Sequence, residues 1–84
     1  MKRDIVHLIT SYLNTHKNFL DSQVKILAQE KYILIYFCYS GLDVEICVYN
    51  ETFIKIKVDK LSFAICDSIK TVRKEIDRLH SKRF

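Results

Sequence analysis

The 84-residue chain contains no proline, no tryptophan and a single glycine, Gly41. Proline and glycine are the residues that most often mark turns, linkers and domain boundaries, so their scarcity leaves no compositional reason to divide the chain. We therefore expect one domain covering residues 1–84. A chain this short buries only about 60% of its unfolded surface, and association with a second copy would add to a small core.

Long apolar runs are also missing. The longest is Tyr32–Tyr39, well short of the roughly 20 residues that a transmembrane helix needs. The start of the chain lacks the pattern of a signal peptide, because polar residues interrupt the apolar segment that follows Met1: Asp4, His7 and Thr10. These features predict a cytoplasmic protein.

Metal-ligating side chains are present, but their spacing does not suit a metal centre. The candidates are Cys38, Cys47 and Cys66 together with His7, His16 and His80. Nothing among them approaches a C-x-x-C or H-x-x-x-H arrangement, and an odd number of cysteines is typical of reduced thiols. Paired carboxylates, a serine nucleophile elbow and a glycine-rich phosphate loop are missing as well. We expect no metal, no cofactor, no small-molecule substrate and no enzymatic activity.

The middle of the chain has the pattern of three β-strands. Tyr32–Tyr39 is aromatic and β-branched, and both Leu42–Tyr49 and Phe53–Val58 alternate between apolar and other residues. Ser40-Gly41 suits a two-residue hairpin turn, and Asn50–Thr52 suits a second turn. The pattern predicts a three-stranded antiparallel meander.

The register of this meander follows from the rule that directly opposite residues share a face. The expected pairs are Val44 with Phe37, Ile46 with Ile35 and Ile56, Val48 with Ile33 and Ile54, Glu45 with Lys57, Cys38 with Asp43, and Cys47 with Leu34. A shift of one residue would mix apolar and polar side chains on both faces. One face is therefore expected to be the core: Ile33, Ile35, Phe37, Tyr39, Leu42, Val44, Ile46, Val48, Ile54, Ile56 and Val58.

A helix is predicted on each side of the meander. Between Ile5 and Leu27 every apolar residue falls in one sector of a helical wheel, which favours one long helix. A second interpretation ends this helix near His16 and makes Val24–Ala28 a short edge strand. The last helix is expected from about Lys60 to His80, capped by Asp59 or Ser62, on an apolar stripe of Leu61, Ile65, Ile69, Val72, Ile76 and Leu79. The expected fold class is α+β, in the order α-β-β-β-α, with both helices on one face of the sheet.

The other face of the sheet is the candidate partner surface. It carries Tyr32, Leu34, Tyr36, Tyr49, Phe53, Lys55 and Lys57, with Cys38, Asp43, Glu45 and Cys47 between them. No segment is left over to cover it, and an exposed aromatic patch is typical of protein interfaces. The alternative is a solvated face stabilised by cross-strand pairs. A first helix of about 35 Å would also overhang strands of about 27 Å, which suggests a homodimer.

The positive charge is confined to the end of the chain. Residues 1–69 hold eight basic and eight acidic side chains, so the net charge of +4 lies entirely in residues 70–84. Candidate phosphate contacts are Lys70, Arg73, Lys74 and Arg78. The alternative is a solvated helix face whose cations favour the helix C-terminus.

The α-β-β-β-α order with a basic last helix resembles the double-stranded RNA-binding domain. That family carries a glycine- and lysine-rich segment before its second helix, whereas Val58–Ala64 has no glycine and no lysine pair, so no RNA contact is carried over. We expect a non-catalytic protein-interaction module of the regulator or inhibitor type, self-associating, like many small motif-free proteins of phages and mobile elements. The alternative is a nucleic-acid-binding domain that uses the basic last helix.

Overall fold

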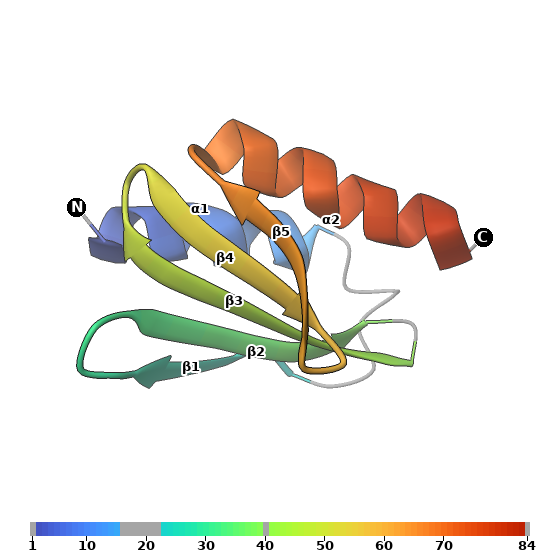
Figure 1. Cartoon of the computed structure of the whole chain (residues 1–84), viewed down its shortest axis with the longest axis horizontal. Coiled ribbons are helices and arrows are strands. Elements are labelled where there is room, and N and C mark those ends of the chain that lie inside the picture. Colours follow the sequence, from blue (N-terminus) through green and yellow to red (C-terminus); the bar gives the residue numbers. More distant parts are fainter. Residues whose placement is uncertain (1, 16–22, 40, 84) are drawn as a thin grey trace.

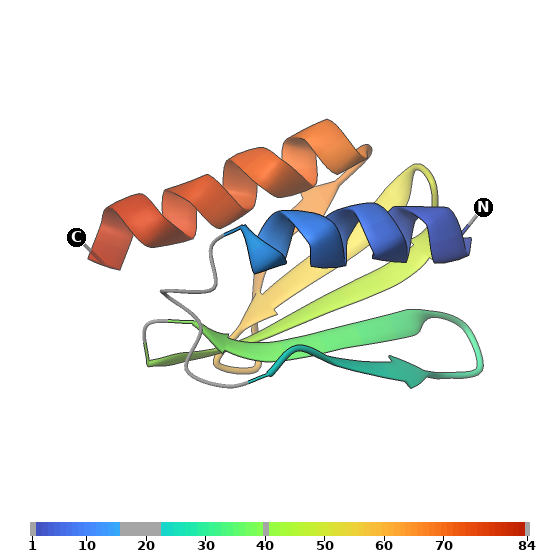
Figure 2. The ribbon, with the colours of Figure 1, turned by 180° about the vertical axis from the view of Figure 1, so that it is seen from behind.

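The computed structural model of the chain describes residues 2–15, 23–39 and 41–83. The elements in chain order are α1 (Lys2–Asn14), β1 (Lys25–Ala28), β2 (Ile33–Tyr39), β3 (Leu42–Asn50), β4 (Phe53–Val58), β5 (Leu61–Cys66) and α2 (Ile69–Arg83). The strands form one antiparallel sheet in sequence order, and both helices lie on the same face of it (Figures 1 and 2). The α+β class is confirmed. The expected three-stranded sheet is wrong, because strands β1 and β5 extend the meander to five strands.

The predicted central ladder is confirmed. Ile35, Ile46 and Ile56 lie opposite one another across β2, β3 and β4, and Glu45 lies opposite Lys57. Cys38 lies opposite Asp43 and Cys47 opposite Leu34, as the register required. The alternation that specified this register also gives the sheet its two faces, here called the inner face, toward the helices, and the outer face.

The core lies between the inner face and the helices. The fully buried strand residues are Ile35, Phe37, Tyr39, Val44, Ile46, Val48, Ile54 and Ile56, and those expected at the sheet ends, Ile33, Leu42 and Val58, pack partly buried against them. The helices contribute two short stripes: Ile5, Val6, Ile9 and Leu13 from α1, and Val72, Ile76 and Leu79 from α2. Each fully buried apolar side chain contributes about 1.5–3 kcal/mol, so this layer dominates the stability of the fold.

The long first helix is wrong, because α1 ends at Asn14. The hydroxyl of Thr15 donates to the carbonyl of Tyr12 at 2.6 Å, and the Thr15 amide donates to the same oxygen at 3.1 Å. Such a side-chain bond competes with the helical backbone pattern at its last turn. Residues 24–28 instead follow the alternative interpretation, since β1 forms an edge strand at Lys25–Ala28. His16 and residues 17–22 of the predicted helix lie outside the described residues.

The last helix begins later than predicted. Asp59 and Lys60 have φ angles of 51° and 68° and form the turn between β4 and β5. The side chain of Asp59 accepts a 3.0 Å bond from the Asp43 amide, which holds this turn against the start of β3. Leu61 and Ile65 were assigned to the buried stripe, but they lie in β5 and are 73% and 62% exposed.

The N-cap of α2 is Ser68 rather than Asp59 or Ser62. Its Oγ accepts from the amide of Thr71 at 3.3 Å, and its carbonyl accepts from the amide of Val72 at 3.2 Å. The α-β-β-β-α order on which the resemblance to the double-stranded RNA-binding domain rested does not hold for a five-stranded sheet. None of the described helices is long and apolar enough to cross a membrane.

The two helices contact each other where α1 ends. The Tyr12 hydroxyl donates to Asp77 Oδ1 at 2.5 Å, and the Arg73 guanidinium lies 5.5 Å from the centre of the Tyr12 ring. Burial and the bond to Asp77 raise the pKa of Tyr12 to about 12. This contact fixes the helix layer over the sheet.

Substituting glycine for Lys60 should change the free energy of unfolding in opposite directions for a hairpin turn and for a helix. We expect Lys60→Gly to raise the free energy of unfolding by about 0.5–1 kcal/mol in urea denaturation, because glycine adopts positive φ without the steric cost that lysine bears. Lys57→Gly, inside β4, should lower it by a similar amount. A loss of about 1 kcal/mol at Lys60, as for glycine within a helix, would contradict the hairpin.

Candidate functional site

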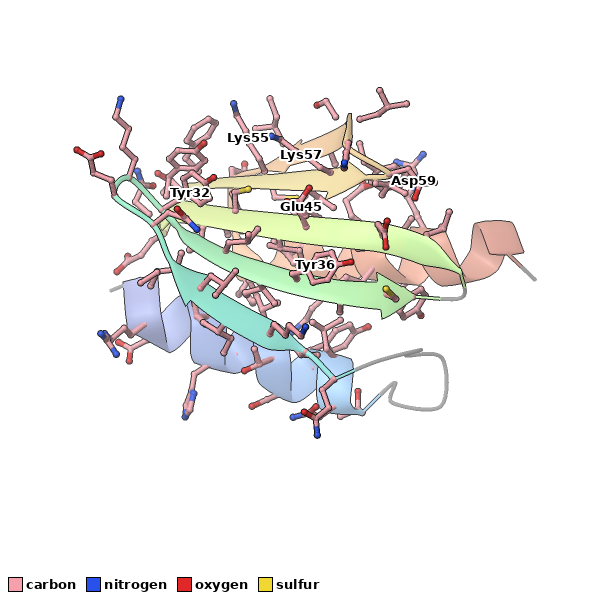
Figure 3. The ribbon with its side chains drawn as sticks, turned by 90° about the horizontal axis from the view of Figure 1, so that it is seen from below. Tyr32, Tyr36, Glu45, Lys55, Lys57 and Asp59 are labelled. Atoms are coloured by element: carbon pink, nitrogen blue, oxygen red, sulfur yellow. The ribbon has the colours of Figure 1, made fainter. Side chains whose placement is uncertain are left out.

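The outer face of the sheet is not covered by any described segment (Figure 3). The structure brings all the sequence-predicted face residues together on it: Tyr32, Leu34 and Tyr36 from β2 and the turn before it, Tyr49 from β3, and Phe53, Lys55 and Lys57 from β4. All seven are partly exposed. Because the helices occupy the inner face alone, this surface is left for contacts outside the described chain.

Strands β1 and β5 widen the outer face with residues that the sequence reading did not place there. Leu27 lies opposite Leu34, and Ile65 lies opposite Lys55. Leu27 is 50% exposed and Ile65 is 62% exposed. The alternation of larger and smaller side chains in Leu61–Cys66, directly after Asp59-Lys60, was the available signal for β5.

The end of the outer face near the β1–β2 and β3–β4 turns is mostly apolar. We call it the apolar half, and it consists of Leu27, Tyr32, Leu34, Cys47, Tyr49, Phe53, Lys55 and Ile65. The rings of Tyr32 and Tyr49 lie 5.0 Å apart, as do those of Tyr49 and Phe53, each pair tilted by 41°. These contacts hold three aromatic side chains in one row beside the cross-strand row of Leu27, Leu34, Cys47, Lys55 and Ile65.

Lys55 lies within the apolar half and is the charged group there. Its Nζ is 5.7 Å from the centre of the Tyr49 ring and 5.6 Å from that of Phe53. An ammonium group in this position is stabilised by the ring electrons, and its stem covers neighbouring apolar surface. The cation is therefore held in place above the aromatic row.

The opposite end of the outer face, here called the polar half, carries charges of both signs. It consists of Lys25, Tyr36, Cys38, Asp43, Glu45, Lys57 and Ser62. Three of these side chains interact: the Tyr36 hydroxyl and the Cys38 thiol donate to Asp43 Oδ1 at 3.2 Å and 3.3 Å, and they lie 3.8 Å from each other. The bonds with Cys38 and Asp43 raise the pKa of Tyr36 to about 12, so its phenol stays neutral through the physiological range.

The three cysteines occupy different environments, and all are thiols. Cys47 lies on the outer face yet is only 3% exposed, between its longer cross-strand neighbours Leu34 and Lys55. Burial raises its pKa. Cys66 is buried on the inner face, where burial, followed by the charges of Glu75 and Asp67, raises its pKa to about 11. Both are therefore protonated, weakly nucleophilic thiols at neutral pH.

The predicted phosphate-contacting residues lie on α2, away from the outer face. Lys70, Arg73, Lys74 and Arg78 are all exposed. The two arginines already make contacts within the protein: Arg73 lies over Tyr12, and Arg78 bonds to Glu75 at 3.1 Å with its guanidinium 6.0 Å from the Phe63 ring centre. This leaves Lys70 and Lys74 as the more available cations of the four.

Two further expectations depend on the same geometry. Within residues 2–15, 23–39 and 41–83, no three His, Cys, Asp or Glu side chains are grouped as metal ligands. The argument for a homodimer from an overhanging first helix loses its basis, because the 13-residue α1 is only about 20 Å long.

His7 is exposed, and the side chain of His80 lies outside what the structure describes.

Comparison of the chain with protein-family models, with curated proteins and with solved structures found no match.

The hydrogen-bonded cluster in the polar half gives a test by pH titration. In a tyrosine-labelled sample followed by NMR, we expect Tyr36 to titrate near pH 12, and Asp43→Asn to move its pKa back toward the ordinary value of 10.0, because the acceptor loses its negative charge. Glu45→Gln removes the cross-strand charge but no bond to Tyr36, so it should shift the pKa less. Titration of Tyr36 near 10 in the unmodified protein would show that this cluster does not form.

Proposed function

We propose that the protein is a non-catalytic interaction module that binds another protein through the apolar half of its outer face. The observation that carries this proposal is that the helices cover one face of the sheet and not the other. The inner face is filled by α1 and α2, whereas the apolar half, rich in aromatic and aliphatic side chains, has no covering segment in the described parts of the chain. Exposed apolar patches that are bordered by polar residues are typical of interaction sites.

The composition of the outer face supports a protein partner. Protein interfaces combine a centre enriched in aromatic residues with a polar, charged rim. The aromatic row has this character, and the charged side chains of Lys25, Glu45 and Lys57 form a ladder along one side of the apolar half. A matching partner would present apolar side chains to the aromatic row and a carboxylate to Lys55.

Preorganisation supports the same proposal. The rings of Tyr32, Tyr49 and Phe53 already pack against one another, so a partner would immobilise few additional rotamers on binding. Completing the burial of the half-exposed Leu27 and Ile65 side chains would contribute about 1 kcal/mol each. The apolar half is thus a surface on which association costs little side-chain entropy and removes apolar area from water.

A protein partner fits the outer face better than single-stranded nucleic acid. A base would need the ring faces of Tyr49 and Phe53, above which Lys55 already lies. Asp43 and Glu45 would repel a phosphate backbone along the polar half. We place this interaction in the cytoplasm, because Cys38, Cys47 and Cys66 are unpaired by disulfides and reducing compartments preserve thiols.

The proposal is tested with two matched variants of β5. Ile65→Glu places a charge in the apolar half, whereas Leu61→Glu introduces the same charge at a residue that is also mostly exposed but pairs with Val58 on the inner-face register. In affinity capture from nuclease-treated extracts, we expect a protein retained by the unmodified chain and by Leu61→Glu to be lost with Ile65→Glu and with Phe53→Asp. Circular dichroism checks that each variant is folded.

Loss of the same protein with both β5 variants, or with neither, would contradict binding through the apolar half. Capture that disappears on nuclease treatment would instead favour nucleic acid. In that case the salt dependence of binding and charge reversal at Lys70 and Lys74 would test the basic last helix.

A further inference from the structure

The sheet has two edge strands, and only β1 is regular. Its four residues, Lys25–Ala28, are all exposed and pair with β2 without a register shift. At the other edge, the pairing of β5 with β4 shifts between Ile56 and Lys57. A bulge of this kind disrupts the regular row of backbone groups and is a common protection of sheet edges. No such bulge interrupts the pairing of β1 among the described residues.

The backbone groups that β1 presents outward can be assigned. The amide of Gln29 donates to the carbonyl of Tyr32 at 2.8 Å, so these two residues form a hydrogen-bonded pair at the β1–β2 turn. Hydrogen-bonded and non-hydrogen-bonded pairs alternate along an antiparallel ladder. Leu27 and Lys25 therefore bond to β2, while Ile26 and Ala28 direct their amide and carbonyl groups toward the open edge.

The side chains of β1 are complementary to a second copy of the same strand. In an antiparallel pair with its two-fold axis at Leu27, Ile26 lies opposite Ala28 of the second copy, and Leu27 lies opposite its own equivalent. Ile26 and Ala28 are the residues whose backbone groups point outward, so this register also satisfies the hydrogen-bonding alternation. Lys25 meets Gln29, so no like charges face each other.

The side chains of β1 on the inner face are also incompletely covered. A groove of about 410 Å³ lies between α1 and β1, lined by Arg3, Asp4, Val6, His7, Ile26, Ala28 and Ile33. Ile26 in its wall is 52% exposed. A second β1 strand would place its own Ile26 and Ala28 beside Ala28 and Ile26 of the first and add apolar side chains to this wall of the groove.

We propose that the protein self-associates through antiparallel pairing of β1 with β1 of a second copy, forming a continuous ten-stranded sheet. Because the two-fold axis is perpendicular to the sheet, both outer faces lie on the same side. The cross-strand row of Leu27, Leu34, Cys47, Lys55 and Ile65 in one copy then continues through Leu27 into the same row of the other. The irregular β5 edge remains at both ends, so the assembly closes at a dimer.

Charged substitutions of Leu27, the residue at the two-fold axis, test this register directly. Self-association is measured by sedimentation velocity from about 1 to about 200 µM protein without any other partner, so failure here is distinguishable from failure of the proposed function. We expect the unmodified chain to shift from monomer to dimer over this range. Leu27→Lys and Leu27→Glu should each remain monomeric, because like charges meet at the axis, and an equimolar mixture of the two should form heterodimers.

A second pair of variants tests the backbone groups. Ile26→Pro removes an amide that points to the open edge and takes part in no bond to β2, so the fold should survive while dimerisation is lost. Ile26→Ala keeps the amide and should weaken the dimer without abolishing it. A monomeric unmodified chain at the highest concentration would overturn the proposal. So would an unmodified level of dimer in either charged Leu27 variant, or a mixture of the two with no more dimer than each alone.

Discussion

Two short helices can cover only one face of a five-stranded sheet, and the burial of the inner face beneath them is the interaction on which the remaining structure depends. Ile35, Ile46 and Ile56 lie in one cross-strand row at its centre and are all fully buried. The period of two in a strand means that burying this row fixes every other side chain of β2, β3 and β4 to a face. The register is therefore set by the core, and the composition of the outer face follows from it.

The side chains of the outer face are ordered by contacts with one another, although no other segment of the described chain covers them. The three aromatic rings and Lys55 pack against one another, and Tyr36, Cys38 and Asp43 share hydrogen bonds at the other end. These interactions order the side chains without any covering layer. Apolar and polar halves thus remain separated on one sheet face, which is the arrangement that the proposed partner contact requires.

The sequence predicted the part of the fold in which a single period is sustained. Leu42–Tyr49 in β3 and Phe53–Val58 in β4 alternate with a period of two, and β2 is a short aromatic and β-branched run, so the three together determine the register. The seven predicted residues of the outer face followed from that register. Only the second interpretation placed β1, as Val24–Ala28, and β5 was missed. The apolar residues of both segments, Val24 to Leu27 and Leu61 to Ile65, also fit a helical stripe. A spacing of four residues, as between Leu61 and Ile65, fits both a strand and a helix. The residues that distinguish the two are polar: Thr15 at the end of α1 and Asp59-Lys60 at the turn before β5.

The central claim is that the inner face is closed and the outer face is open, and solvent access to methyl groups tests it most directly. In dilute, methyl-labelled protein, a soluble gadolinium chelate broadens NMR signals according to their distance from solvent. The structure predicts strong broadening for Leu34 and Ile65 on the outer face and little for Ile46 and Ile56 on the inner face. Equal protection of Leu34 and Ile65 with the inner-face pair would mean that the chain covers its own outer face, and would contradict this account.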